Sequence, residues 1–417
     1  MTSVMPSVAP SPQAPAPTPG PVPSVGAAVA GEIRRLALYG SVVVSFLAAS
    51  AAPTPLYQHY NTVWHGTALT TTTAFASYAG AVLVGLLMLG ELSNHVGRRP
   101  VLLAAIAAQA LSVTLIATAG SFAPLFAARI IQGVATGAAL GTLGASMIDI
   151  HRDRGTILNV AAPGIGSGVG ALVAGLLVGY LPWPTHLVYL TLLVILVAQG
   201  VGIARQPETT PRAPGLVGSL RPQIAVPAPA RAAFLAAAPV IFAAWALPGF
   251  YASLGPALTR DLAHSRSVAL GGVALFLVAG LASVASVVLR DLTAGRMMTV
   301  GIATLAVGAV GSAGAIAAGS EAAYLVSTAL AGVGFGASLQ GGIRTVTPLA
   351  SPEQRPGLLS AVFVVSYAGM GIPAVIAGYL VSRGHDLRQV AVGYVLALVL
   401  LAGAAAVSLA RTSPRRG

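Results

Sequence analysis

The sequence of 417 residues contains no cysteine and no lysine, and only 8% of its residues are charged. Without cysteine, the chain can form no disulfide, no thiolate nucleophile and no cysteine-ligated metal site. Soluble domains carry roughly 25% charged residues, so a water-soluble fold of this length would lack the polar surface to cover itself. With 56% hydrophobic residues and a mean hydropathy of +0.84, the composition predicts an integral membrane protein.

The apolar residues fall into blocks of roughly 20, the length that an α-helix needs to cross a hydrocarbon core of about 30 Å. They do not alternate with polar residues, as they would in the strands of a membrane barrel. We therefore expect an all-α integral membrane fold with twelve transmembrane helices, at residues 36–53, 71–93, 100–119, 123–147, 157–180, 184–204, 233–255, 267–289, 297–318, 322–343, 357–382 and 388–410.

A polar, proline-rich stretch divides these segments into two bundles of six. The predicted organisation is a disordered cytoplasmic tail (1–30), a first bundle (31–204), a cytoplasmic linker (205–231), a second bundle (232–411) and a short cytoplasmic tail (412–417). The loop at 94–99 and the loop at 291–296 occupy the same place in their halves, and both contain Gly-Arg. This internal repetition is typical of transporters built from two pseudo-repeats.

The formal charge of +12 comes entirely from arginine, and the arginines indicate the orientation. With the N-terminus inside, seventeen arginines lie at the inner ends of the predicted helices and four at the outer ends. Such a bias predicts that both termini are cytoplasmic. The arginines stand singly or in pairs between apolar blocks, which argues against a nucleic-acid partner. Alanine- and arginine-rich usage without lysine suggests a bacterial inner-membrane protein.

One loop carries a family resemblance. It resembles the signature loop of the major facilitator superfamily of secondary transporters at Gly90, Leu92, Asn94, Gly97, Arg98, Arg99 and Leu102. Glycines permit a tight turn between antiparallel helices, and arginines anchor it in the headgroup region. The resemblance implies that Arg98 bonds an aspartate of the loop and the acidic Asp149, latching the two halves. Asn94 stands where the family has aspartate, so we expect the latch to be weaker or to rely on Asp149 and Glu91. The alternative is that Gly-Arg-Arg only sets the topology.

A second resemblance lies in the fourth segment, where Arg129, Gln132, Gly133 and Gly137 look like a family motif within the membrane. A charge there costs at least about 2.5 kcal/mol on insertion scales, so it needs partners or water. The alternative is an arginine that extends outward to the headgroups. The fifth segment, rich in glycine from Gly164 to Gly175, looks like a degraded exporter motif, although close helix packing alone would explain it.

The family alternates access to a central cavity lined by the first, fourth, seventh and tenth helices. The polar and aromatic residues that we expect to line it are Gln132, Trp245, Tyr251, Gln340 and Tyr367. They suit a moderately apolar organic solute. No carboxylate lies near the middle of a predicted helix, so proton coupling is an expectation from the resemblance only.

We therefore expect a monomeric secondary transporter that exports a moderately hydrophobic drug or metabolite, with no cofactor and no metal site. Uptake of a small organic nutrient is the alternative. An integral-membrane enzyme is a remote alternative, because the sequence offers no cluster of acid, base or metal-ligand residues and no P-loop.

Overall fold

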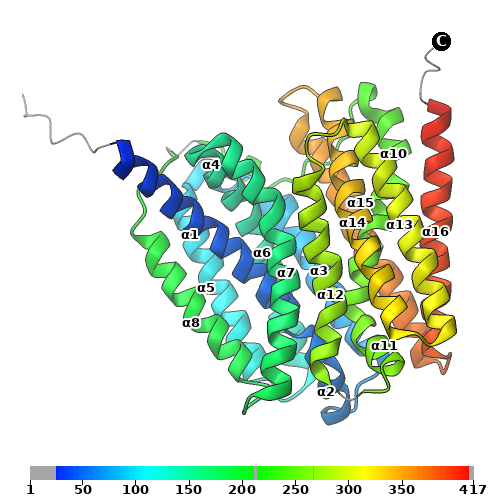
Figure 1. The fold of residues 1–417 in the computed structure, drawn as a ribbon. Helices are drawn as coiled ribbons and strands as arrows, with labels where there is room; N and C mark the ends of the chain where they lie inside the picture. The colour runs from blue at the N-terminus through cyan, green and yellow to red at the C-terminus, as the bar shows by residue number, and fades with distance from the viewer. Residues whose placement is uncertain (1–24, 211–213, 266, 413–417) are drawn as a thin grey trace, which may run out of the picture.

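A computed structural model describes residues 25–210, 214–265 and 267–412 of the chain (Figure 1). All regular elements in these ranges are helical. They are, in chain order, α1 (Val25–Ala51), η1 (Thr54–Leu56), α2 (Tyr57–Val63), α3 (Ala68–Leu89), α4 (Ser93–Val96), α5 (Arg98–Ala117), α6 (Phe122–Ile150), α7 (Arg152–Tyr180), α8 (Leu187–Ala204), α9 (Leu216–Ser219), η2 (Ala228–Ala230), α10 (Arg231–Ser253), α11 (Gly255–Leu262), α12 (Val268–Val288), α13 (Ala294–Ala318), α14 (Glu321–Val346), η3 (Thr347–Leu349), α15 (Arg355–Ser382) and α16 (Leu387–Thr412).

Twelve of these helices are long, and they confirm the predicted all-α membrane fold. Eleven helical segments of the described chain are long and apolar enough to cross a membrane. The twelfth is α16, which is apolar from Leu387 to Gly403. Helices α1 to α8 form the first half of the molecule and α10 to α16 the second, and the segment between Ala204 and Arg231 connects them.

The first helix begins earlier than we expected. The predicted tail extends to residue 30 and the predicted helix starts at residue 36, whereas α1 begins at Val25. The prolines of the N-terminal region stop at Pro23, and the alanine-rich residues that follow have good helix propensity. The boundary at residue 30 was therefore wrong, while residues 1–24 of the predicted tail lie outside the described residues.

The two ends of the molecule differ in what they carry. One end carries α4 and the segment between α8 and α10, and we refer to it as the α4 end (Figure 1, upper side). The other carries the short helices α2 and α11, and we refer to it as the α2–α11 end (Figure 1, lower side). The arginine bias predicts that the α4 end is cytoplasmic.

Close helix packing within each half depends on glycine. A Cβ atom on Gly133 or Gly137 of α6 would collide with the backbone of α3. In the second half, a Cβ atom on Gly332 or Gly336 of α14 would collide with the backbone of α12 in the same way. The two halves thus repeat one Gly-x-x-x-Gly contact, a spacing that lets membrane helices approach closely.

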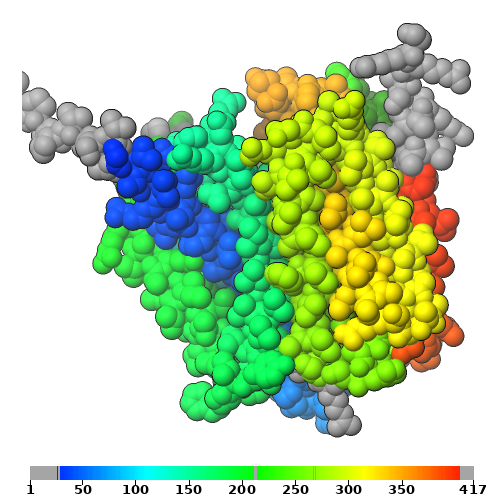
Figure 2. Space-filling model, in the orientation of Figure 1, coloured from blue at the N-terminus to red at the C-terminus, as the bar shows by residue number. Residues whose placement is uncertain are grey.

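The halves meet along two helix pairs, α7 with α12 and α3 with α15. Figure 2 shows the green surface of α7 lying along the yellow-green surface of α12. The glycines of α7 divide between two partners: Gly164 and Gly168 face α12, and Gly166 and Gly170 face α1. The glycine-rich fifth segment therefore serves helix packing at the contact between the halves.

Candidate functional site: a central cavity

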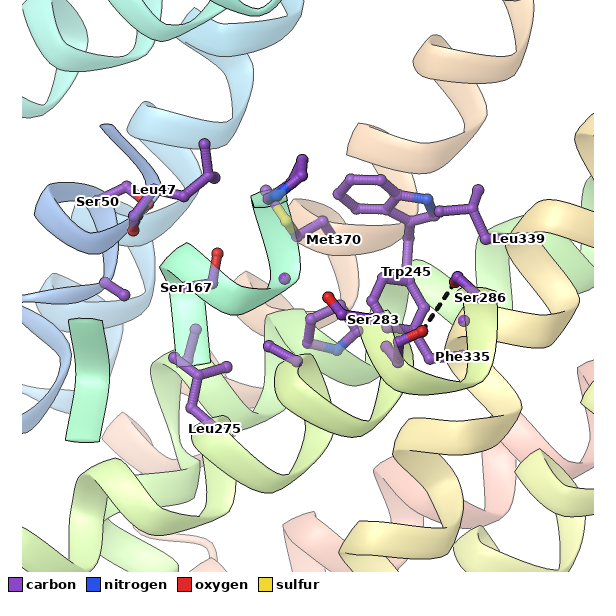
Figure 3. Close-up of a pocket in the computed structure, with 18 of the residues that line it drawn as sticks. Leu47, Ser50, Ser167, Trp245, Leu275, Ser283, Ser286, Phe335, Leu339 and Met370 are labelled. Atoms are coloured by element: carbon purple, nitrogen blue, oxygen red, sulfur yellow. Dashed lines mark hydrogen bonds between the residues drawn. The ribbon is translucent and has the colours of Figure 1, made fainter. Parts of the chain in front are cut away.

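A central cavity of about 200 Å³ lies between the two halves (Figure 3). Helices α1, α3, α6 and α7 line it from one side and α10, α12, α14 and α15 from the other. The set includes the first, fourth, seventh and tenth long helices, as the resemblance implied. None of the residues that line the cavity is an aspartate, glutamate, histidine or arginine.

The cavity is closed at the α2–α11 end. There the backbone N–H of Leu69 in α3 donates to Ser382 Oγ in α15 at 2.8 Å, and Gly378 of α15 packs directly against Thr72 of α3. These contacts join the two halves directly at this end.

Three aromatic side chains of the second half form one wall. The ring centroid of Trp245 in α10 lies 5.7 Å from that of Phe335 in α14, with the rings nearly perpendicular, and 5.2 Å from that of Tyr367 in α15. Figure 3 shows the Trp245 indole beside Leu339 and Phe335. The indole Nε1 is buried and has no hydrogen-bond partner among the described residues. Within the described chain, this wall presents apolar faces and two donors without a hydrogen bond, the indole Nε1 of Trp245 and the hydroxyl of Tyr367.

Three of the five predicted substrate-binding residues line this cavity, namely Trp245, Gln340 and Tyr367. The prediction was wrong for the other two. Tyr251 is buried inside the second half, where its hydroxyl lies 2.9 Å from Thr328 Oγ1. Gln132 is also buried and turns towards Arg129 rather than the cavity. A helical period identifies a buried face, but it does not distinguish the face towards the cavity from the face towards a neighbouring helix.

Arg129 lies inside the first half with no exposed surface. Its Nη1 donates to the Ser50 carbonyl oxygen at 2.8 Å and to Gln132 Oε1 at 2.5 Å. Its guanidinium carbon lies 4.2 Å from the ring centroid of Tyr78, a cation–π distance. Burial excludes the alternative of an arginine that extends outward to the headgroups. Because Ser50 and Tyr78 also line the cavity, the charge lies directly behind the cavity wall.

The signature loop forms an arginine-centred network at the α4 end. Arg98 Nη1 donates to Ser93 Oγ at 2.8 Å and to Asn94 Oδ1 at 2.9 Å, and Arg98 Nη2 lies 3.4 Å from Asp149 Oδ2. The pairing of Arg98 with Asn94 and Asp149 agrees with the resemblance. All these partners belong to the first half, however, so the network does not latch the two halves as expected.

The two glycines of the loop have different roles. Gly97 has a φ of +101°, a left-handed conformation that glycine adopts without strain, and it turns the chain into α5. Gly90 is helical, with a φ of −59°, and its backbone lies against Gly141 of α6. Gly90 nevertheless lies in the turn that follows α3, as expected, and it is also part of a close helix contact.

Glu208, in the connecting segment, is a functional candidate that the sequence did not indicate to us. Its carboxylate accepts the backbone N–H groups of Arg98 at 2.9 Å and Arg99 at 3.0 Å, the first two residues of α5. Partial burial acts to raise the pKa of Glu208, but bonds from the backbone N–H groups of Arg98, Arg99, Thr209 and Thr210 outweigh it and lower the pKa. We refer to this contact as the Glu208 cap. Its only sequence signal is that Glu208 is the sole acidic residue between Arg205 and Arg231.

Comparison with known proteins identifies the architecture. The model of the Major Facilitator Superfamily matches residues 38–363. A bacterial homologue of the human lysosomal transporter Spinster, in an inward-facing and unoccupied conformation, superposes with a TM-score of 0.72 at 13% identity, over 92% of this chain and 99% of that one. A POT family transporter in complex with 5-aminolevulinic acid gives a TM-score of 0.73 at 11% identity, over 91% of this chain and 97% of that one.

The xylose transporter XylE from E. coli, in a partially occluded inward-open conformation, gives a TM-score of 0.69 at 14% identity, over 93% of this chain and 98% of that one. At such identities the structures show a shared fold, and the family model covers most of the chain. The chain therefore belongs to the Major Facilitator Superfamily and is a multi-pass secondary transporter.

Proposed function

We propose that this transporter exports a small, moderately hydrophobic aromatic compound through the central cavity. The observation that carries the proposal is the uncharged cavity wall formed by Trp245, Phe335 and Tyr367. A sugar or a phosphate would need several hydrogen-bonding or cationic groups, because each of its polar groups loses water on binding. An aromatic ring needs only apolar and aromatic surface.

The size and the polar groups of the cavity further limit the class of compound that it can hold. An apolar protein cavity of roughly 150 Å³ holds a benzene molecule, so about 200 Å³ suits a compound with one ring and a short substituent. Trp245 Nε1 donates to nothing among the described residues, and the hydroxyls of Ser283 and Ser286 already donate to backbone carbonyls. A neutral solute with a carbonyl or ether oxygen would satisfy the indole N–H.

Proton coupling is part of the proposal because family membership favours it. Arg129 stays charged at any physiological pH. Its placement behind Ser50 and Tyr78 supports an electrostatic influence on whatever occupies the cavity. Because no carboxylate lines the cavity of this state, we expect Arg129 to act by favouring oxygen atoms of the solute rather than by carrying a proton itself.

The test is accumulation of small aromatic compounds in cells that lack their own exporters. Expression should lower accumulation, and a protonophore should restore it. Trp245→Ala should raise the concentration for half-maximal transport about tenfold, since loss of about 1.4 kcal/mol of binding is a tenfold change. Trp183→Ala is the matched control, because Trp183 is 71% exposed and lies outside the cavity.

The outcomes separate the parts of the proposal. Accumulation that rises on expression would identify an uptake permease instead of an exporter. Export that continues unchanged in the presence of the protonophore would contradict proton coupling but not export itself. Equal transport by the Trp245 and Trp183 variants would overturn the assignment of the aromatic wall.

A further inference from the structure

The first helix of each half is interrupted at the α2–α11 end. Helix α1 ends at Ala51 and is followed by η1 and the short helix α2, and α10 ends at Ser253 and is followed by the short helix α11. Prolines stand at both interruptions, Pro53 and Pro55 in the first half and Pro256 in the second. In transporters built from repeats, helices interrupted at corresponding positions point to a binding site.

A separate pocket of about 320 Å³ lies between these two short helices, and we refer to it as the α2–α11 pocket. It is more polar than the central cavity, and its lining includes Gln58, Asn61 and Thr62 of α2, Thr67 before α3, and Arg260 of α11. Thr54 lines both the pocket and the central cavity. The pocket therefore lies on the far side of the closed end of the cavity.

Arg260 is the one charged side chain that lines this pocket within the described chain. Its Nε donates to the Pro256 carbonyl oxygen at 3.2 Å, while its Nη2 is buried without a hydrogen-bond partner. The neighbouring Asp261 forms no ion pair with Arg260 in the described chain; its carboxylate lies 2.6 Å from Arg388 Nε instead. A guanidinium in this setting has strong donors available for an oxyanion.

Among the described residues, the second group without a hydrogen-bond partner at the pocket belongs to Asn61 of α2. Asn61 donates from its amide nitrogen to Thr71 Oγ1 at 2.7 Å, and its amide oxygen is buried without a partner. Unsatisfied buried polar groups are costly, so an unpaired guanidinium nitrogen and an unpaired amide oxygen on two residues that line one pocket indicate a polar occupant.

We propose that the α2–α11 pocket is a second binding site, for a small organic carboxylate. The carboxylate pairs with Arg260, and a hydroxyl or amino group on the same molecule donates to Asn61. The volume lies at the lower end of the roughly 300–1,000 Å³ that small-molecule sites span, which limits the ligand to a few carbon atoms. The pocket lies beyond the closed end of the central cavity, so a ligand can bind here without entering the cavity.

Protection of a single cysteine tests the site, because the chain has no cysteine of its own. Thr62→Cys places a thiol in the pocket, and Ser121→Cys places one on an exposed residue at the same end outside it. The purified protein in lipid nanodiscs is labelled with a thiol reagent in the presence of acetate, lactate or benzoate. Lactamide, the neutral amide of lactate, is the control compound.

We expect at least one carboxylate, with lactate the best, to slow labelling of Thr62→Cys at least fivefold. Lactamide should not slow it, and labelling of Ser121→Cys should not change. Arg260→Gln should abolish the protection, Arg260→Lys should retain part of it, and Arg383→Gln, which changes another arginine near this end, should leave it intact. Retained protection with Arg260→Lys also shows that an altered Arg260 still permits folding.

The proposal is overturned if none of the three carboxylates protects Thr62→Cys, if lactamide protects equally, or if protection survives Arg260→Gln. Each of these results concerns binding at the α2–α11 pocket. None of them bears on the aromatic cavity, which the accumulation experiment tests independently.

Discussion

The Glu208 cap connects the segment between the halves to the signature loop, and its removal should release that segment. Glu208→Ala deletes the acceptor of the N–H groups of Arg98 and Arg99 at the start of α5. Loss of a helix N-cap costs about 1 kcal/mol, within a range of about 0.5–2 kcal/mol. Because Glu208 is largely exposed, water partly replaces its carboxylate in the variant. We therefore expect the cap to lose about 1 kcal/mol of stabilisation. That shift increases the released population roughly fivefold.

Limited trypsin digestion measures this population. The chain has no lysine, so cleavage in the connecting segment follows arginine, and cutting after Arg205 or Arg212 separates the two halves. When opening and closing are fast relative to cleavage, the rate follows the open population. Glu208→Ala should therefore be cut about five times faster. Glu32→Ala is the matched control, because Glu32 pairs with Arg154 in α7 and does not contact the connecting segment.

The Glu208→Gln variant separates charge from hydrogen bonding. Its amide oxygen still accepts one N–H group, but the negative charge at the helix N-terminus is lost, a change of about 0.3–1 kcal/mol. Cleavage should then lie between the rates of the native protein and Glu208→Ala. Equal cleavage of Glu208→Ala and Glu32→Ala would refute the reasoning and would show that other contacts hold the connecting segment.

Four further changes test the remaining assignments. The backbone N–H bonds hold the folded pKa of Glu208 below 4.5, so the cap's stabilisation should be constant above that pH and lost as the pH falls through the folded value, measured as increased mobility of a spin label at Thr210→Cys. Arg129→Lys keeps the charge but loses the planar fork, and Arg129→Gln loses the charge; transport by the lysine variant only would show that charge is required, and normal transport by both would exclude a functional role. Gly336→Val should destabilise the fold by roughly 1–3 kcal/mol through overpacking and so lower the folded yield. Gly314→Ala should not lower it, because a Cβ there meets nothing within 4 Å; equal yields would contradict the packing role. A periplasmic reporter fused to the C-terminus should be inactive, and activity there would invert the predicted topology.

Helix positions were predictable because insertion into a bilayer depends on length and apolarity, which a sequence displays directly. The predicted segment 157–180 falls within α7, and the predicted 357–382 ends at the same residue as α15. The short helices α2 and α11 were not predicted, since they lie beyond the apolar blocks and contain polar residues. Prolines marked both interruptions, but proline alone does not say whether a helix resumes after it.

The candidate site was predictable only in part. Trp245 and Tyr367 were correctly expected at the cavity, because polar or aromatic residues on helices that face the centre are few. The prediction that Tyr251 lines the cavity was wrong, because its hydroxyl bonds Thr328 on a helix far away in sequence. Glu208 lies in the connecting segment and Arg260 lies in the short helix α11, both outside the long apolar helices. The residues that they face are set by tertiary structure and leave no periodic pattern.

The repeat relation shows how the two halves differ at the position that holds the buried cation Arg129. Gly133 and Gly137 of α6 correspond to Gly332 and Gly336 of α14, because both pairs make the same contact with a neighbouring helix. One turn before Gly133 stands Arg129, and one turn before Gly332 stands Thr328. The position that holds a buried cation in the first half thus holds a hydroxyl bonded to Tyr251 in the second.

The contact between the halves bears on how the cavity can change its exposure. Between the two bundles of the described chain, the hydrogen bonds are Leu69 with Ser382 and Ser283 with the Ala161 carbonyl, and no ion pair joins them. The remaining contact is close packing of small residues such as Gly168 and Gly272. Separating such surfaces leaves no buried charge without its partner. A buried charge that lost its partner would cost about 3–5 kcal/mol. The closed α2–α11 end can therefore open at modest cost, and Arg129 keeps its partners within one half while it does so.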